Sequence, residues 1–169
     1  NSFMHKGNFV AGWGNNELQY YRIGKGKLNT NNNLFIEDSK LKIQPIFHKN
    51  KYKDFEFTSA RIHTKGKRPF TFPAKITFCF KVPSGIGFWP AFWLMPVKNK
   101  AWPQGGEIDI MEQNGWDKDN LIGHLHWGDT QTKAYNNQGG TKRVQNTATE
   151  FNLYSLVWTK DKIRILFNN

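Results

Sequence analysis

Apolar and polar residues alternate with a period of two along much of this chain. In the segment 75–82 every second residue is large and apolar, and a threonine, a cysteine and a lysine stand between them. The apolar set is Ile76, Phe78, Phe80 and Val82. Because successive side chains of a β-strand point to opposite faces, this pattern predicts a strand with one buried face.

Six other segments have the composition or alternation of strands: 41–44, 55–64, 107–111, 121–127, 151–158 and 163–167. No stretch has the apolar spacing of an amphipathic helix, and seven prolines and fifteen glycines interrupt the strands at short intervals. The sequence therefore predicts an all-β sandwich, in one domain that spans residues 1–169. Since no strand follows 163–167, we expect one edge of that strand to lie unpaired.

The composition excludes several classes of protein. Aromatic residues make up 15% of the 169 residues, which excludes a disordered chain, and no apolar run approaches the length of a membrane span. The single cysteine, Cys79, rules out an internal disulfide framework. The net charge of +11, with no acidic residue between positions 57 and 106, indicates either a solvated lysine-rich surface or a basic face for an anionic partner. No nucleic-acid motif accompanies it.

Three carboxylates lie within six residues, at Glu107, Asp109 and Glu112. On a regular strand Glu107 and Asp109 point the same way, and Glu112 is out of phase. A β-bulge around 110–111 would return Glu112 to their face, and bulges are frequent beside active sites. Clustered carboxylates titrate together, so that one holds a proton while another stays ionised. Glycoside hydrolysis needs this division, and the separation of the two carboxyls decides between retention and inversion.

Four motifs in consistent order resemble glycoside hydrolase family 16, and within it the laminarinases, which are endo-β-1,3-glucanases. They are Gly-Trp-Gly-Asn-Asn-Glu-Leu-Gln-Tyr-Tyr at 12–21, Thr-Ser-Ala-Arg-Ile at 58–62, Gly-Phe-Trp-Pro-Ala-Phe-Trp at 87–93 and Glu-Ile-Asp-Ile-Met-Glu at 107–112. The resemblance implies a β-jelly-roll sandwich of two antiparallel sheets with a concave substrate cleft. It also implies a retaining mechanism, with Glu107 as nucleophile, Glu112 as acid/base and Asp109 as the residue that orients Glu107. The family's domain is longer at both ends than this chain.

Aromatic and polar side chains are expected to line the cleft. Flat indole rings pack against the C–H faces of sugars, and the resemblance places Trp89, Trp93, Trp102, Arg61 and His126 at the substrate. Asn15 and Asn16 resemble cleft amides in the same way. Trp13, Trp116, Trp127 and Trp158 are interpreted as packing residues of the core or of the surface. His124 and His126 alternate on one strand and so share a face, but no third residue completes a zinc site, and we predict no metal ligand.

The expected substrate is a laminarin-type β-1,3-glucan or a mixed-linkage β-1,3-1,4-glucan, and the expected location is secreted, extracytoplasmic or lysosomal, although no signal peptide is visible. We predict no cofactor and no nucleic-acid or membrane partner; the structural calcium common in the family has no identifiable ligands here. Two alternatives remain on the same scaffold. One is a glucan-recognition protein without activity, against which the three acids argue, and the other is a transglycosylase or a sulfated-galactan hydrolase.

Overall fold

The computed structural model of this protein describes residues 15–22, 33–98 and 100–169. The chain divides into two compact units, residues 1–69 and residues 70–169, and each is described by itself. The prediction of a single domain over 1–169 stays a prediction.

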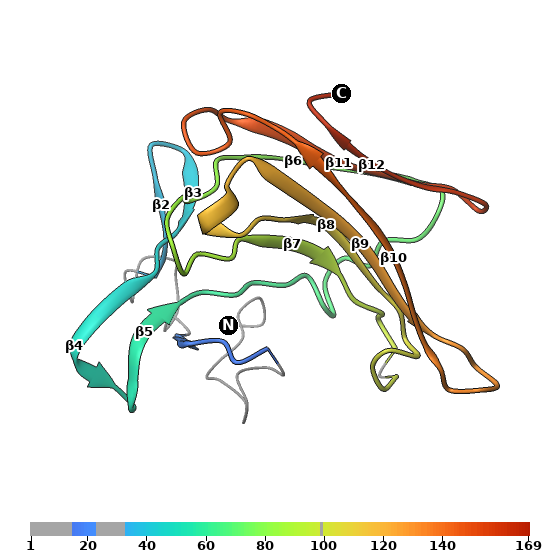
Figure 1. The fold of residues 1–169 in the computed structure, drawn as a ribbon, viewed down its shortest axis with the longest axis horizontal. Coiled ribbons are helices and arrows are strands. Elements are labelled where there is room, and N and C mark those ends of the chain that lie inside the picture. The colour runs from blue at the N-terminus through green and yellow to red at the C-terminus, as the bar shows by residue number, and fades with distance from the viewer. Residues whose placement is uncertain (1–14, 23–32, 99) are drawn as a thin grey trace. The chain divides into compact units, whose positions relative to one another are not determined.

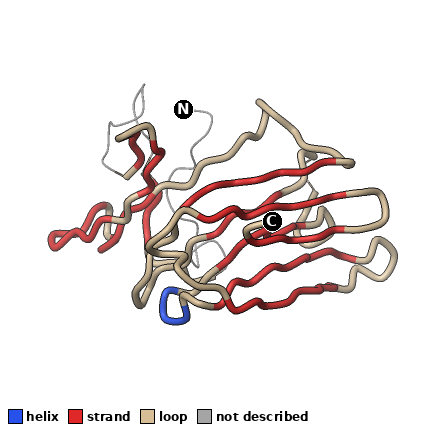
Figure 2. Tube along the Cα trace, turned by 90° about the horizontal axis from the view of Figure 1, so that it is seen from above, coloured by secondary structure: helices blue, strands red, loops and turns tan. Residues whose placement is uncertain are grey.

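Residues 70–169 form two antiparallel sheets (Figure 1). The four-stranded sheet has the order β10-β9-β8-β7 and consists of β7 (Ala91–Leu94), β8 (Glu107–Glu112), β9 (Asn120–Gly128) and β10 (Tyr135–Arg143). The three-stranded sheet has the order β12-β11-β6 and consists of β6 (Ala74–Phe80), β11 (Asn152–Trp158) and β12 (Ile163–Phe167). One short 3₁₀ helix, η2 (Gly115–Asp117), follows β8 (Figure 2).

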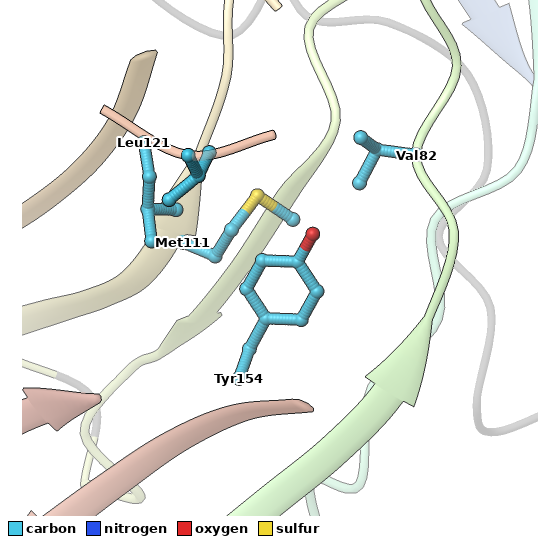
Figure 3. Packing of buried hydrophobic residues seen from close by; sticks show 5 residues of the cluster. Val82, Met111, Leu121 and Tyr154 are labelled. Atoms are coloured by element: carbon cyan, nitrogen blue, oxygen red, sulfur yellow. The ribbon is translucent and has the colours of Figure 1, made fainter. Parts of the chain in front are cut away.

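The core of this unit lies between the two sheets. Ile76 of β6 and Leu156 of β11 pack against Ile110 of β8, so the sheets face each other through their apolar sides. A second cluster joins Met111 and Leu121 of the four-stranded sheet to Tyr154 of β11, as Figure 3 shows together with Val82. Fully burying one such side chain contributes about 1.5–3 kcal/mol. The unit is therefore a β-sandwich held by interdigitating inner faces.

The described residues of the unit 1–69 form two small sheets. One has the order β1-β5-β4, with β1 (Gln19–Tyr21), β4 (Ile46–Tyr52) and β5 (Phe55–Ser59), and the other pairs β2 (Leu34–Glu37) with β3 (Lys40–Ile43). The hairpin loops 38–39 and 53–54 have two residues each, and all four residues have positive φ. This conformation matches the right-handed twist of the flanking strands, and it explains how so short a loop closes each hairpin.

The all-β class is confirmed, as are strands at six of the seven predicted segments to within about two residues. The exception is the predicted strand 55–64, which ends at Ser59 because its neighbours β1 and β4 offer no partner residue beyond that point. The sequence pattern does not predict β1, β2, β4, β7 or β10. One pair also departs from an antiparallel arrangement, since β1 runs parallel to β5. The connection between these two strands is long enough to allow it.

Within the described part of the chain, no helix combines the length and apolar character needed to cross a membrane. Among the described strands, β12 lies at one edge of its sheet. This agrees with the expectation that one edge of this strand is unpaired.

Candidate active site

A β-bulge in β8 brings the three carboxylates to one face. On the side of β7 the register advances two residues along β8, from Met111 to Asp109, for one residue along β7. On the side of β9 the register advances three residues along β8, from Glu112 to Asp109, for two residues along β9. Ile110 and Met111 are both buried, with 0% and 1% of their surface exposed. Two consecutive residues thus enter the core, and Glu112 returns to the other face, so the predicted bulge is confirmed.

The two glutamates each accept a hydrogen bond from an indole. Trp102 Nε1 donates to Glu107 Oε2 at 2.7 Å, and Trp89 Nε1 donates to Glu112 Oε1 at 2.9 Å. Trp102 and Trp89 are 54% and 49% exposed as residues, so a large part of each remains open to a ligand. Both tryptophans were predicted to border the site, but the sequence does not reveal that their N–H groups hold the two acids in place.

Asp109 is the most buried of the three acids, with 4% of its surface exposed. Its Oδ2 lies 3.0 Å from His126 Nε2, and its side chain is also hydrogen-bonded to Glu107. Burial, followed by the charges of Glu107 and Glu112, raises the pKa of Asp109 to about 8. At neutral pH Asp109 therefore carries a proton and can donate it in a hydrogen bond to the Glu107 carboxylate.

The pKa of Glu112 is also raised, mainly by burial, while its bond from Trp89 acts in the opposite direction and the charge of Glu107 adds to the rise. Burial thus favours the neutral form of Glu112, which stands on the same face as Glu107. Acid-assisted displacement requires a carboxyl that keeps its proton beside a second carboxyl that acts as an ionised nucleophile.

Strands β9 and β10 extend this face beyond the acids. His126 lies opposite Glu107 in the ladder and His124 opposite Asp109, and the two rings stack with centroids 4.4 Å apart. Burial, and then the neighbouring His124, lower the pKa of His126, so its imidazole is neutral at pH 7. Gly139 of β10 lies opposite His124, where a Cβ would come within 2.8 Å of the His124 ring.

Two residues of β10 belong to this site and are not found by the sequence analysis. The Tyr135 hydroxyl oxygen lies 2.7 Å from His126 Nδ1, and Asn137 Oδ1 lies 3.1 Å from His124 Nε2. The prediction that both histidines share a face and that their strand pairs with β8 is confirmed. However, His126 contacts Asp109, and this contact was not predicted.

The remaining predicted site residues lie in two places. Trp93 is half-buried on β7, opposite Asp109 in the ladder. Asn15, Asn16 and Arg61 belong to residues 1–69, where Asn15 Nδ2 donates to Glu17 at 3.4 Å. Asn16 has a φ of 55°. Their place at the substrate stays a prediction.

Of the four tryptophans interpreted as packing residues, three can be placed. Trp158 packs against the core cluster around Ile110, whereas Trp116 and Trp127 are exposed. Trp13 lies outside the described residues, as do Gly12 and Gly14 of the first motif.

Among the described residues, no group of three His, Cys, Asp or Glu side chains is arranged to hold a metal ion. The calcium site that the family resemblance implies therefore has no such ligand cluster in this part of the chain.

Comparison with known proteins identifies a family that this chain matches. Residues 25–164 match the family described as "XgeA-like, catalytic GH16 domain". The chain is 38% identical over 170 residues to a beta-glucanase of Rhodothermus marinus, with 90% of this chain and 52% of that protein covered, so it spans about half the length of this relative.

Among solved structures, LamAcat from Zobellia galactanivorans is similar with a TM-score of 0.83 and 34% identity over 99% of this chain and 70% of that one. A LamA variant from Z. galactanivorans in complex with laminaritriose and laminaritetraose gives a TM-score of 0.82 and 34% identity, with 99% of this chain and 71% of that chain covered.

Proposed function

This chain belongs to glycoside hydrolase family 16, and we propose that it cleaves internal β-1,3 bonds of laminarin-type glucan with retention of anomeric configuration. The observation that carries the proposal is the face of β8, where Glu107, Asp109 and Glu112 lie together. On this face the indoles of Trp102 and Trp89 bind Glu107 and Glu112, respectively. The names of the relatives support the choice of glucan, because one is a beta-glucanase and another was solved with laminari-oligosaccharides.

The proposed reaction has two displacements. In the first, a carboxylate oxygen of Glu107 attacks the anomeric carbon, the glycosidic C–O bond breaks, and protonated Glu112 transfers its proton to the departing sugar oxygen. In the second, the Glu112 carboxylate removes a proton from water, the water oxygen bonds to the anomeric carbon, and Glu107 leaves. Each displacement inverts the anomeric carbon, so the product has the configuration of the substrate.

The third carboxyl has a supporting role in this scheme. Asp109, protonated at neutral pH, donates a hydrogen bond to Glu107. This bond holds the Glu107 carboxylate in one orientation and stabilises it again when it leaves as the second displacement ends. Trp102 acts on the same carboxylate from another side through its Nε1–H group.

We propose that the substrate lies over the exposed rings of Trp89 and Trp102, with Trp93 and His126 on the same sheet face. Flat aromatic faces suit the C–H faces of glucose. Asn15, Asn16 and Arg61 are proposed to bind sugar hydroxyls, as the family resemblance implies. The mixed-linkage β-1,3-1,4-glucan is a second candidate substrate of the same chemistry.

The test measures release of reducing ends from laminarin and from mixed-linkage β-glucan, with agarose as a galactan control, and follows the anomeric configuration of the first products by NMR. We expect β-anomers from laminarin and no release by the Glu107→Gln variant, which is nearly isosteric but cannot form the glycosyl ester. Binding of laminarin without hydrolysis by the unsubstituted protein would instead identify a glucan-recognition protein. First products with the α configuration would exclude the double displacement.

A further inference from the structure

A continuous chain of contacts connects β10 to the proposed nucleophile. The Tyr135 hydroxyl oxygen lies 2.7 Å from His126 Nδ1, and His126 Nε2 lies 3.0 Å from Asp109 Oδ2. Asp109 is hydrogen-bonded in turn to Glu107. Strands β10, β9 and β8 all contribute to this series of contacts. His126 and Asp109 stand between Tyr135 and Glu107 in it.

The direction of the central hydrogen bond depends on which nitrogen of His126 carries the proton. A neutral imidazole has one N–H donor and one acceptor nitrogen. With the proton on Nε2, His126 donates to Asp109, and the proton of Asp109 is available to Glu107. With the proton on Nδ1, the bare Nε2 accepts the proton of Asp109, and Glu107 loses that hydrogen bond.

Two features favour the proton on Nε2. The Tyr135 hydroxyl is a better donor than acceptor, because its oxygen lone pair is delocalised into the ring, so its O–H group is best used toward Nδ1. At the other end, a carboxylic acid forms its strongest hydrogen bond to an ionised carboxylate. Both ends therefore favour the arrangement in which Tyr135 donates to His126, His126 to Asp109, and Asp109 to Glu107.

The ring of Tyr135 also contacts the second partner of Glu107. It lies 5.3 Å from the Trp102 ring between centroids and is stacked on His126 at 5.9 Å, with 13° between the planes. Tyr135 is 48% exposed, so its ring could also contact a sugar directly. Replacement of tyrosine by phenylalanine separates these roles, because it removes only the hydroxyl group and keeps both ring contacts.

We propose that Tyr135 is a positioning residue whose hydroxyl group fixes His126 in the Nε2–H tautomer, so that the proton of Asp109 serves Glu107. The kinetic part of this inference rests on the proposed function, whereas the tautomer does not. The bond donated to His126 acts on the reaction only through Asp109 and Glu107. Loss of the hydroxyl should therefore lower kcat more than it changes KM.

The direct test is ¹⁵N NMR of histidine-labelled protein, with the signal of His126 assigned from a His126→Ala variant. We expect the Nε2–H tautomer in the unsubstituted protein and a measurable fraction of the Nδ1–H tautomer in Tyr135→Phe. Gln138→Ala is the matched control, since Gln138 lies on β10 with its side chain on the opposite face of the strand and is exposed. An unchanged tautomer in Tyr135→Phe, or the Nδ1–H tautomer in the unsubstituted protein, would overturn the proposal.

The kinetic test is a double-mutant cycle on laminarin. Loss of one hydrogen bond predicts that kcat of Tyr135→Phe falls about tenfold while KM changes less than about twofold. In the His126→Ala background the same replacement should cause no further loss, because Tyr135 acts through His126. A loss of equal size in both backgrounds, or a change confined to KM, would show that Tyr135 contacts the sugar instead. If the unsubstituted protein releases no sugar, the proposed function fails, and the NMR result still decides the tautomer.

Discussion

The two faces of the four-stranded sheet are built in different ways from the same strands. On the inner face, Ile110 and Met111 of β8 are buried among apolar side chains of the opposite sheet, and their fit is set by volume and shape. On the outer face, Glu107, Asp109 and Glu112 are held by indole, imidazole and carboxyl hydrogen bonds, each of which requires a donor opposite an acceptor. Apolar packing on the inner face tolerates the exchange of one apolar side chain for another of similar volume. The hydrogen bonds on the outer face do not tolerate the loss of a donor or an acceptor.

The bulge in β8 lets one strand serve both faces. Because Ile110 and Met111 both point inward, two core clusters receive a side chain from consecutive residues, and Glu112 still reaches the outer face. The comparison implies that the two functions of the strand are separable. Changes on the outer face should reduce activity with little loss of stability, and changes on the inner face should do the reverse.

After the complete loss expected for Glu107→Gln, the largest effect is expected on the outer face, for Glu112→Ala. Loss of general acid catalysis should reduce the rate on laminarin by about 10²–10⁴-fold, and less on an aryl glucoside whose leaving group needs no proton. Added azide should restore turnover and give a β-glycosyl azide. Glu150→Ala, at an exposed acid of the same unit, is the control and should retain activity. An α-azide product would contradict the roles given to Glu107 and Glu112.

On the inner face, Leu156→Ala should destabilise the protein without changing the chemistry. Leu156 is fully buried against Ile110, and truncation of such a leucine lowers the free energy of unfolding by about 2–5 kcal/mol. Leu153→Ala, on the same strand but 40% exposed, should have a much smaller effect. Urea unfolding gives both values, and kcat is measured well below the midpoint. A large loss of kcat with unchanged stability would show that the two faces are not separable.

The buried acid of the outer face predicts an effect of pH on stability. The pKa of Asp109 rises from 3.8 in the unfolded chain to about 8 in the folded protein, so the folded state binds more protons between these values. The contribution of Asp109 to the free energy of unfolding is therefore largest below pH 4, and it declines as pH rises toward 8. Asp109→Asn should show a shallower decline in unfolding free energy over this window. Parallel profiles for the two proteins would refute the assigned protonation of Asp109.

A smaller effect on activity than that of Glu112→Ala is expected for Trp102→Phe, which removes the N–H donor to Glu107 and keeps an aromatic ring. Loss of one hydrogen bond to a charged group should lower kcat/KM by roughly tenfold or somewhat more. Trp127→Phe serves as the control, because Trp127 is exposed and directly follows His126 on β9, so its side chain points to the opposite face of the strand. Equal losses in the two variants would mean that the indole N–H of Trp102 has no special role.

The same contrast between faces explains what the sequence could predict. Strands β6, β8, β9, β11 and β12 contribute residues to the core, and their alternation or apolar content reveals them. Strand β7 also packs Phe92 and Leu94 against the core, but its four residues are too few to show a period. Strand β10 has the sequence Tyr-Asn-Asn-Gln-Gly-Gly-Thr-Lys-Arg, and most of its residues are exposed. It carries no apolar period, so Tyr135 and Asn137 could not be placed beside the histidines before the pairing of β10 with β9 was known.

Hairpin loops were missed for a different reason. The loops 38–39 and 53–54 contain Asp-Ser and Lys-Asp in place of the Asn-Gly or Asp-Gly pairs that usually mark two-residue turns.

For the site, the requirement that three acids converge was enough to predict the bulge in β8. The contact of His126 with Asp109 joins neighbouring strands and depends on their register, which alternation within one strand does not determine.

The central claim, that Glu107 is the nucleophile on the outer face of β8, is tested most directly by trapping the glycosyl-enzyme. A 2-deoxy-2-fluoro laminaribioside with a good leaving group should react faster than its ester is hydrolysed, because fluorine destabilises the transition state of both steps while the leaving group accelerates only the first. Digestion and tandem mass spectrometry then locate the sugar. We expect one fluorinated disaccharide per protein, attached to Glu107, and none on Glu107→Gln. Attachment to Glu112, or inactivation with no covalent sugar, would contradict the account.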